Sequence, residues 1–242
     1  MREMIARHLG AMKKTINLLR KYYEGFPKTA ASGDEHDVRH PYPHCFKSLV
    51  DSKECHFNYT RQMDDKLLFF GYVVPKNSAD SRRDQPKEEL CIKFVRRYSK
   101  EAHRICASGL CAPRLRGFES LPGGWYMVVM DAVDKEYIDL SKLDKSARTP
   151  DLLEKIRAKL SHLHQEGYVH GDVRDTNVMV RPDGKGFMLV DFDWSGEIGE
   201  VRYPINIVKG LQLWRPDEAE DGQLITADHD QEMLEYMFAR DV

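Results

Sequence analysis

Oxygen-bearing side chains recur in two short segments on either side of a turn. Asp172 and Asn177 stand in the first segment, and Asp191 stands in the second. Each segment borders a short apolar run that favours a β-strand, and the connector between the runs is rich in turn formers. The runs are residues 178–180 and 187–190, and the connector is residues 181–186. A hairpin of this kind places the three side chains at one end, facing the same space.

Two carboxylates and an amide oxygen grouped in this way suit a hard divalent cation such as magnesium, together with its phosphate ligand. One carboxylate can also take a proton from an attacking hydroxyl group. The alternative interpretation is that Asp172, Asn177 and Asp191 are ordinary turn residues, because aspartate and asparagine are common in turns.

The two segments carry a family resemblance. His170-Gly-Asp172, with Asn177 five residues after the aspartate, resembles the protein-kinase catalytic loop. Asp191-Phe-Asp193 resembles the metal-binding D-F-G motif of the same enzymes. Glycine in place of the catalytic-loop arginine, and Asp193 in place of the last glycine, make the chain similar to atypical and small-molecule kinases such as the aminoglycoside and choline kinases. Residues 191–204 also resemble kinase-like proteins of unknown substrate from mushroom-forming fungi.

The resemblance implies an α+β fold with two lobes, a small antiparallel-sheet N-lobe and a truncated, mainly helical C-lobe. We expect a helix and loop extension over residues 1–55, the N-lobe over 56–131 and the C-lobe over 132–242. Expected strands lie at 66–74, 90–95, 114–118 and 125–130, and expected helices at 1–24, from Glu101 onward, from 149–150 to about 164, and at 224–238.

Nucleotide-binding residues follow from the same resemblance. Lys93, in a Cys-Ile-Lys-Phe setting, matches the strand lysine that contacts the α- and β-phosphates. Glu101 is the best-placed glutamate to pair with it, although the gap is shorter than is usual in the family. Residues 130–134 resemble the hinge, so the backbone of Met130 and Ala132 would meet the adenine edge. The expected glycine-rich phosphate loop is missing, because Gly71 stands alone before Lys93.

The implied reaction is transfer of the ATP γ-phosphoryl group to a hydroxyl, with ATP and Mg²⁺ as cofactors. Asp172 would orient and deprotonate the acceptor, while Asn177 and Asp191 would hold the metal. Arg174 is either a phosphate contact or a solvent-facing charge. Further roles are implied for three other residues: His170 bracing the Asp191-Phe192 segment, Asp193 adding to the metal site or capping a turn, and Asp230 bracing the catalytic loop.

Other functions stay open. The missing glycine loop also fits a pseudokinase, a nucleotide-binding or scaffold module without catalysis, and the chain would alternatively be a fragment of a larger kinase. The acceptor, a protein or a small molecule, has no signature in the sequence. Four histidines in or near the polar stretch 28–54, together with Cys45 and Cys55, raise the question of a second metal site. Scattered loop histidines are the commoner explanation. These histidines are His36, His40, His44 and His56.

The net charge and the cysteine content limit the classes of partner and the redox setting that we expect. The formal charge of −2 gives no bulk attraction to nucleic acid or to a membrane. No apolar run approaches the roughly 20 residues of a membrane span. The five cysteines have no C-x-x-C spacing, and an odd count without a framework favours reduced thiols in a cytoplasmic or nuclear setting.

Overall fold

The computed structural model describes residues 2–24, 43–63, 66–74, 88–210 and 213–239. The chain divides into two units, Met1–Tyr42 and Pro43–Val242. The first contains helix α1 (Arg2–Glu24), as the spacing of apolar residues predicts. Among the described residues, none of the helices has the length and apolar character needed to span a bilayer.

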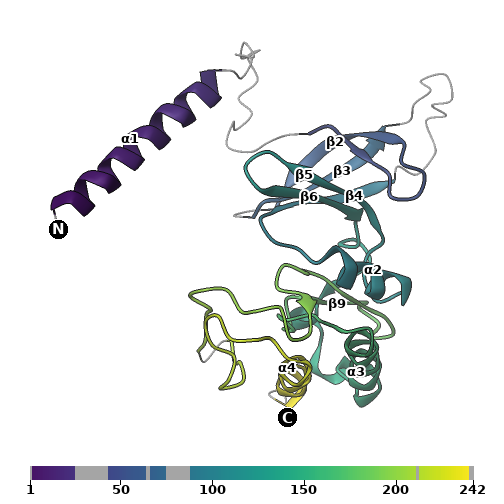
Figure 1. The fold of residues 1–242 in the computed structure, drawn as a ribbon. Coiled ribbons are helices and arrows are strands. Elements are labelled where there is room, and N and C mark those ends of the chain that lie inside the picture. The colour runs from purple at the N-terminus through teal and green to yellow at the C-terminus, as the bar shows by residue number, and fades with distance from the viewer. Residues whose placement is uncertain (1, 25–42, 64–65, 75–87, 211–212, 240–242) are drawn as a thin grey trace, which may run out of the picture. The chain divides into compact units, whose positions relative to one another are not determined.

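A six-stranded antiparallel sheet forms the first half of the second unit (Figure 1). Its strands lie in the order β1-β2-β3-β4-β6-β5. Their bounds are β1 (Cys45–Lys47), β2 (Glu54–Gln62), β3 (Leu68–Val74), β4 (Glu89–Val95), β5 (Leu115–Leu121) and β6 (Trp125–Asp131). In β4 the side chains alternate, so Leu90, Ile92 and Phe94 are buried while Cys91 and Lys93 are only partly buried. This two-residue period sets Lys93 on the face opposite the core.

Strands β1 and β2 differ from the sequence prediction, which treated residues 28–54 as a loop. β1 has only three residues, and most of the side chains of β2 are exposed. Phe46 and Phe57 are the buried exceptions. Such short or polar strands carry little hydrophobic periodicity and form because they pair with each other and with β3. The predicted loop after β3 lies largely at residues 75–87, outside the described residues.

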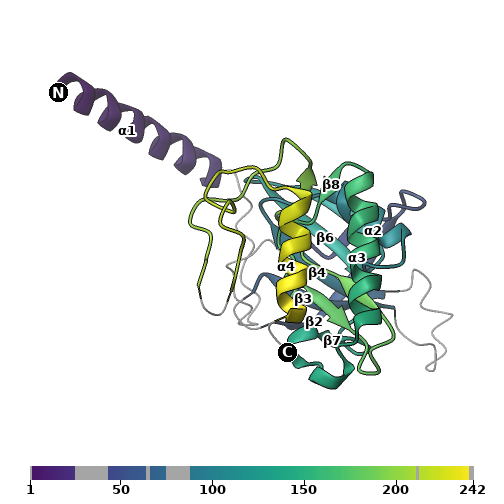
Figure 2. The same cartoon turned by 90° about the horizontal axis from the view of Figure 1, so that it is seen from below.

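Helices form the core of the second lobe. Helix α2 (Lys100–Ser108) connects β4 to β5, and helices α3 (Pro150–Gln165) and α4 (Ala227–Ala239) lie side by side beneath the sheet (Figures 1 and 2). The apolar stripe of α3 is fully buried and belongs to the same core cluster as Leu189 and Leu234. That stripe consists of Leu152, Ile156, Leu160 and Leu163. An antiparallel sheet lobe and a helical lobe confirm the predicted α+β architecture.

Threonine side chains cap the N-termini of α3 and α4. Thr149 accepts a hydrogen bond from the backbone N–H of Leu152, so it caps α3 as predicted. At the start of α4, Thr226 performs the same role, because its hydroxyl oxygen accepts from the N–H of His229 at 3.3 Å.

Short strands frame the loops between the helices. β7 (Ile138–Asp139) pairs with β9 (Val178–Val180), which forms a hairpin with β10 (Phe187–Leu189). β8 (Tyr168–Val169) pairs with β11 (Gly196–Glu197). Two short 3-10 helices, η2 (Leu140–Lys142) and η3 (Lys145–Ala147), lead into α3. The segment that carries Asp172 and Asn177 therefore runs from β8 to β9, and Asp191 follows β10.

Candidate active site

The loop between β8 and β9 requires glycine at position 171. Gly171 has φ of +82°, and a Cβ there would lie 2.6 Å from the carbonyl oxygen of Trp194. A side chain would be strained by the backbone conformation and blocked by that close approach. The departure from the kinase-like arginine at this position therefore has a local structural cause.

Asp230, on α4, anchors the same loop through hydrogen bonds to its backbone. Its carboxylate accepts hydrogen bonds from the backbone N–H of His170 at 2.7 Å and of Gly171 at 2.8 Å, and it is 1% exposed. The bracing role predicted for Asp230 is thus present. His164 also contacts this carboxylate, with its Nε2 3.0 Å from Oδ2.

His170 links the loop to the segment after β10. Its Nε2 lies 3.1 Å from the carbonyl oxygen of Val190, and its ring packs on Phe192 with centroids 5.1 Å apart. The hydroxyl of Ser195 donates to the His170 carbonyl oxygen at 2.7 Å. His170 therefore braces the Asp191-Phe192 segment, as predicted, and does so from a fully buried position.

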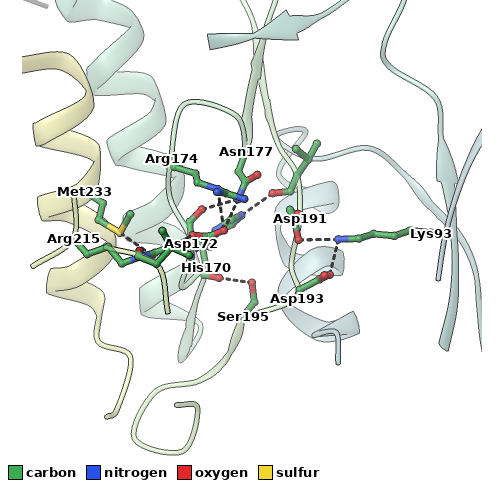
Figure 3. Close-up of polar contacts among 12 residues, drawn as sticks. Lys93, His170, Asp172, Arg174, Asn177, Asp191, Asp193, Ser195, Arg215 and Met233 are labelled. Carbon is green, nitrogen blue, oxygen red and sulfur yellow. Dashed lines mark hydrogen bonds and ion pairs between the residues drawn. The ribbon is translucent and has the colours of Figure 1, made fainter. Parts of the chain in front are cut away.

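Asp172 is surrounded by donors from three residues (Figure 3). Its Oδ1 lies 2.5 Å from Nη2 of Arg215. Its Oδ2 accepts from Nδ2 of Asn177 at 2.8 Å and lies 3.1 Å from Nε of Arg174. Asn177 also donates to the Asp172 carbonyl oxygen at 2.9 Å. These contacts fix the rotamer of a carboxylate that is 6% exposed.

Arg215 was not singled out from the sequence. It is 4% exposed, its Nε donates to the Val208 carbonyl oxygen at 3.3 Å, and its guanidinium lies over the Trp194 ring at 4.6 Å from the centroid. A buried arginine needs a carboxylate partner, and Asp172 is that partner. The Leu213-Trp-Arg-Pro stretch has no periodicity that would indicate burial, so no sequence signal identified this contact.

Lys93 bridges two carboxylates after β10 (Figure 3). Its Nζ lies 2.8 Å from Asp191 Oδ1 and 2.7 Å from Asp193 Oδ1. Asp191 has φ of +71°, a left-handed backbone conformation that non-glycine residues seldom adopt outside functional sites. Lys93 on the sheet lobe is thereby tied to the segment that follows the hairpin.

The charges of Lys93, Asp191 and Asp193 shift one another's pKa values. Burial opposes ionisation of Asp191, but the Lys93 ammonium outweighs it and lowers the pKa of Asp191. Burial and the neighbouring Asp191 charge raise the pKa of Asp193 to about 7. Burial also opposes the charge on Lys93, yet both carboxylates together raise its pKa. The cluster therefore carries more acid groups than one lysine neutralises.

The structure does not bring Glu101 to Lys93. Glu101 is exposed on the first turn of α2, and among the ion pairs of the described residues Lys93 pairs only with Asp191 and Asp193. The inward face of α2 instead carries Ala102, His103 and Cys106. The gap between β4 and α2 is short, so position 101 falls just before this inward face begins. The Glu101 side chain is therefore exposed.

His103 occupies the place on α2 that faces the site, and sequence reasoning missed it. Its ring stacks on Phe192 with centroids 4.7 Å apart and planes 6° apart. Nδ1 lies 2.8 Å from the Tyr98 hydroxyl and Nε2 lies 2.7 Å from the Pro113 carbonyl oxygen. Burial lowers the pKa of His103 to about 4, so the ring is neutral near pH 7 and packs as an apolar surface with two polar ends.

A pocket of about 140 Å³ lies between the sheet lobe and the hairpin. Lys93, Asn177 and Asp191 line its polar end, and Met130 belongs to its apolar wall. Ala132 is not among the described lining residues, and its N–H donates to the Glu89 carbonyl oxygen at 3.2 Å. The other apolar lining residues include Phe70, Cys91 and Met179.

The chain is similar to known kinases in sequence and in fold. A sequence model of the RIO domain matches residues 82–199. The serine/threonine-protein kinase SMU1 of Mycosarcoma maydis is 26% identical over 139 residues, which is 55% of this chain and 17% of that protein. Myosin-IIIa of Mus musculus is 34% identical over 59 residues, which is 24% of this chain and 4% of that protein. The matches thus span less than a fifth of either curated relative.

A solved structure shares the fold. The Cydia pomonella granulovirus kinase PK-1 aligns with a TM-score of 0.58 and 14% identity, covering 77% of this chain and 70% of that one. The identity is too low to carry more than the architecture. Together with the RIO-domain match and the kinase relative, it accounts for the sheet lobe and the helical lobe. The chain therefore has a protein kinase-like fold, and its sequence is similar to the RIO domain and to a serine/threonine-protein kinase.

Proposed function

We propose that the chain is an ATP- and magnesium-dependent phosphotransferase that transfers the γ-phosphoryl group to a hydroxyl group. One observation carries the proposal: Lys93, Asn177 and Asp191 line one pocket, and Asn177 also donates to the buried carboxylate of Asp172. A nucleotide in this pocket would have its phosphates at the polar end and its base against the apolar wall. Met130 belongs to that wall and supports the predicted hinge position.

The donor atoms suit a magnesium ion. Asp191 and Asp193 offer carboxylate oxygens, and Asn177 offers an amide oxygen because its amide nitrogen is occupied by Asp172. Hard cations prefer oxygen ligands of this kind. Magnesium, when bound, would neutralise charge on the transferred phosphoryl group. Asp193 joins Asp191 and Asn177 in this proposal because both aspartates contact the same lysine.

Asp172 is proposed to accept the proton of the acceptor hydroxyl. A carboxylate has about four lone-pair positions, and hydrogen bonds from Asn177 and Arg215 occupy two of them, while Arg174 lies close to Oδ2 as an ion pair without a hydrogen bond. One position on Oδ1 thus remains for a hydroxyl donor, while the arginines hold the group in one orientation. Arg174 is about one-third exposed and next to Asp172, which favours the phosphate contact over the solvent-facing charge as its role.

The alternative is a nucleotide-binding module without catalysis. Gly71 does not belong to a phosphate loop: it lies in β3, where a Cβ would meet the Asn58 carbonyl oxygen at 2.4 Å. It is also the only glycine between residues 34 and 108. A glycine-rich cover for the phosphates is therefore lacking in the sequence before Lys93, and this observation keeps the alternative open.

Two measurements separate these functions. Thermal unfolding with ATP, with and without Mg²⁺, tests binding, since a ligand of the native state raises its stability by mass action. Transfer of labelled phosphate from ATP to a panel of protein and small-molecule acceptors tests catalysis. Magnesium-dependent stabilisation with transfer supports the phosphotransferase. Stabilisation without transfer or ATP hydrolysis would favour the binding module, and no stabilisation would contradict both.

A further inference from the structure

A second group of metal-binding side chains lies at the β1 end of the sheet. Cys45 is on β1, and Glu54 and His56 are on β2. One donor atom from each residue lies within 4.8 Å of the other two. None of the three lines the nucleotide pocket, so this group is separate from the candidate active site.

Strand pairing, and not a chance meeting of flexible side chains, brings the three residues together. Cys45 is directly opposite His56 in the antiparallel register. Glu54 precedes His56 by two residues and therefore lies on the same face of β2. Directly opposed residues have closely spaced Cβ atoms, which means that the backbone itself presents thiol, imidazole and carboxylate to one point.

The ligand types select the cation. A thiolate, an imidazole and a carboxylate are zinc ligands, whereas magnesium and calcium take oxygen ligands. With Zn–S of about 2.3 Å and Zn–N of about 2.0 Å, two donors on one tetrahedral zinc lie roughly 3.5 Å apart. His56 Nε2 is now 2.9 Å from Glu54 Oε1. Side-chain rotations are therefore sufficient to place all three donors around an ion, with the backbone unchanged.

The local charge favours a cation. Glu119 on β5 approaches the same strand, because its Oε1 accepts from the backbone N–H of Lys47 at 2.7 Å. Lys47 stands opposite Glu54 in the register but forms no ion pair among those found in the described residues. Glu54 and Glu119 thus bring two carboxylates close to the strand that carries Cys45.

We propose that Cys45, Glu54 and His56 bind one zinc ion on the exposed face of β1 and β2, with water as the fourth ligand. On binding, a Zn–S bond forms, the Cys45 proton passes to solvent, and the protein ligands replace three of the waters on the ion. The ion would join β1 to β2, which are otherwise held by three residue pairs. Zinc should therefore stabilise this edge of the sheet.

Cobalt is a spectroscopic probe for this site. The full chain, without a polyhistidine tag and after treatment with chelator and reductant, is titrated with Co²⁺ and then with Zn²⁺. One Co²⁺ per chain should give thiolate-to-cobalt charge-transfer absorption, and Zn²⁺ should abolish it. Excess Mg²⁺ should leave the absorption unchanged. Cys45→Ser should remove the absorption, and both Cys45→Ser and His56→Gln should weaken Zn²⁺ binding at least about 100-fold, since loss of an outer partner alone costs 10–100-fold.

Cys55 provides a matched control. It lies between Glu54 and His56 on β2, but it is paired with Phe46 and its Sγ contacts the Lys53 carbonyl oxygen at 3.8 Å. Alternation along the strand turns it to the other face. Cys55→Ser should bind Co²⁺ and Zn²⁺ like the unaltered chain, and zinc should raise its thermal midpoint equally. The proposal is overturned if the unaltered chain lacks the charge-transfer absorption, if Cys45→Ser keeps it, or if Cys55→Ser loses it. None of these outcomes depends on ATP or phosphotransfer.

Discussion

The two charge clusters of the candidate site have opposite imbalances. Around Lys93, two carboxylates share one ammonium group, and the pKa of Asp193 rises to about 7. Around Asp172, two guanidinium groups share one carboxylate. The cluster around Lys93 has an excess of carboxyl groups, and the cluster around Asp172 has an excess of guanidinium groups.

The difference matches the two needs of phosphoryl transfer. An excess of carboxylate favours a divalent cation, and an excess of guanidinium favours an anion near the acceptor group. Asn177 connects them, because its side chain donates to Asp172 and its carbonyl oxygen accepts from the N–H of Val190, next to Asp191. If the proposed function is right, substitutions in the two clusters should have different consequences.

The largest effect is expected at Asp172. Asp172→Asn removes the proposed proton acceptor but keeps an oxygen for Arg215, so phosphoryl transfer should fall by about 10²–10⁴-fold. ATP-dependent stabilisation should survive, because Lys93 and Asp191 are intact. Transfer of labelled phosphate and thermal shift with MgATP measure the two properties. Turnover equal to that of the unaltered chain would reject the assignment.

Arg215 should contribute mainly to stability. Arg215→Met leaves the buried Asp172 carboxylate without its 2.5 Å partner, and breaking a buried ion pair in this way costs about 3–5 kcal/mol of unfolding free energy. Urea denaturation measures the loss. Arg104→Met, at an exposed position of α2, is the matched control and should change stability by no more than about 0.5 kcal/mol. Equal stability of the two variants would show that the Arg215 contact contributes nothing.

Asp193 should make stability depend on pH in a direction set by its raised pKa. Between the ordinary value of 3.8 and about 7 the folded state keeps this proton while the unfolded state loses it. The unfolded state is therefore favoured as pH rises through that window, and this contribution to stability declines. Asp193→Asn cannot ionise, so its stability relative to the unaltered chain should rise with pH up to about 7 and then level off.

Thermal midpoints across this range, in chelator to exclude divalent cations, provide the test. Asp183→Asn is a suitable control, because hydrogen bonding to the Lys185 backbone lowers the pKa of Asp183. Its relative stability should not rise between pH 4 and 7. A flat difference for Asp193→Asn would mean that Lys93 keeps both carboxylates ionised.

The smallest effect is expected at Glu101. The sequence predicts a pair with Lys93, whereas the structure places Glu101 on the exposed side of α2. Glu101→Gln should change stability by no more than about 0.5 kcal/mol and leave MgATP stabilisation intact, while Lys93→Met should abolish that stabilisation. A loss of ATP binding in Glu101→Gln would show that the nucleotide-bound state brings Glu101 to Lys93 after all.

Local patterns predicted much of the fold. The apolar run at 90–95 predicted the strand that carries Lys93, and Thr149-Pro150 marked the start of α3. The apolar runs at 178–180 and 187–190 predicted a hairpin with Asp172, Asn177 and Asp191 at one end. These features depend on a few neighbouring residues, and short-range backbone preferences are sufficient to produce them.

Longer-range choices were not predictable in the same way. Arg215 lies 43 residues after Asp172, and the 209–217 stretch has neither helical nor strand periodicity. Glu101 and His103 share one short helix, and only the packing of α2 against Phe192 decides which of them faces the site. The cross-strand meeting of Cys45 and His56 needs β1 to form, and a three-residue strand carries almost no signal of its own.

The amino-acid sequence alone determined that the chain carries one segment resembling the kinase catalytic loop, a second resembling the D-F-G motif, and a lysine-bearing strand, because each is a local pattern of residue types. Tertiary structure alone decided which charges neutralise one another: Lys93 with Asp191 and Asp193, and Asp172 with Arg174 and Arg215. The physical reason is burial. A charge removed from water must find a partner wherever the chain brings one, and that partner's position in the sequence is not constrained.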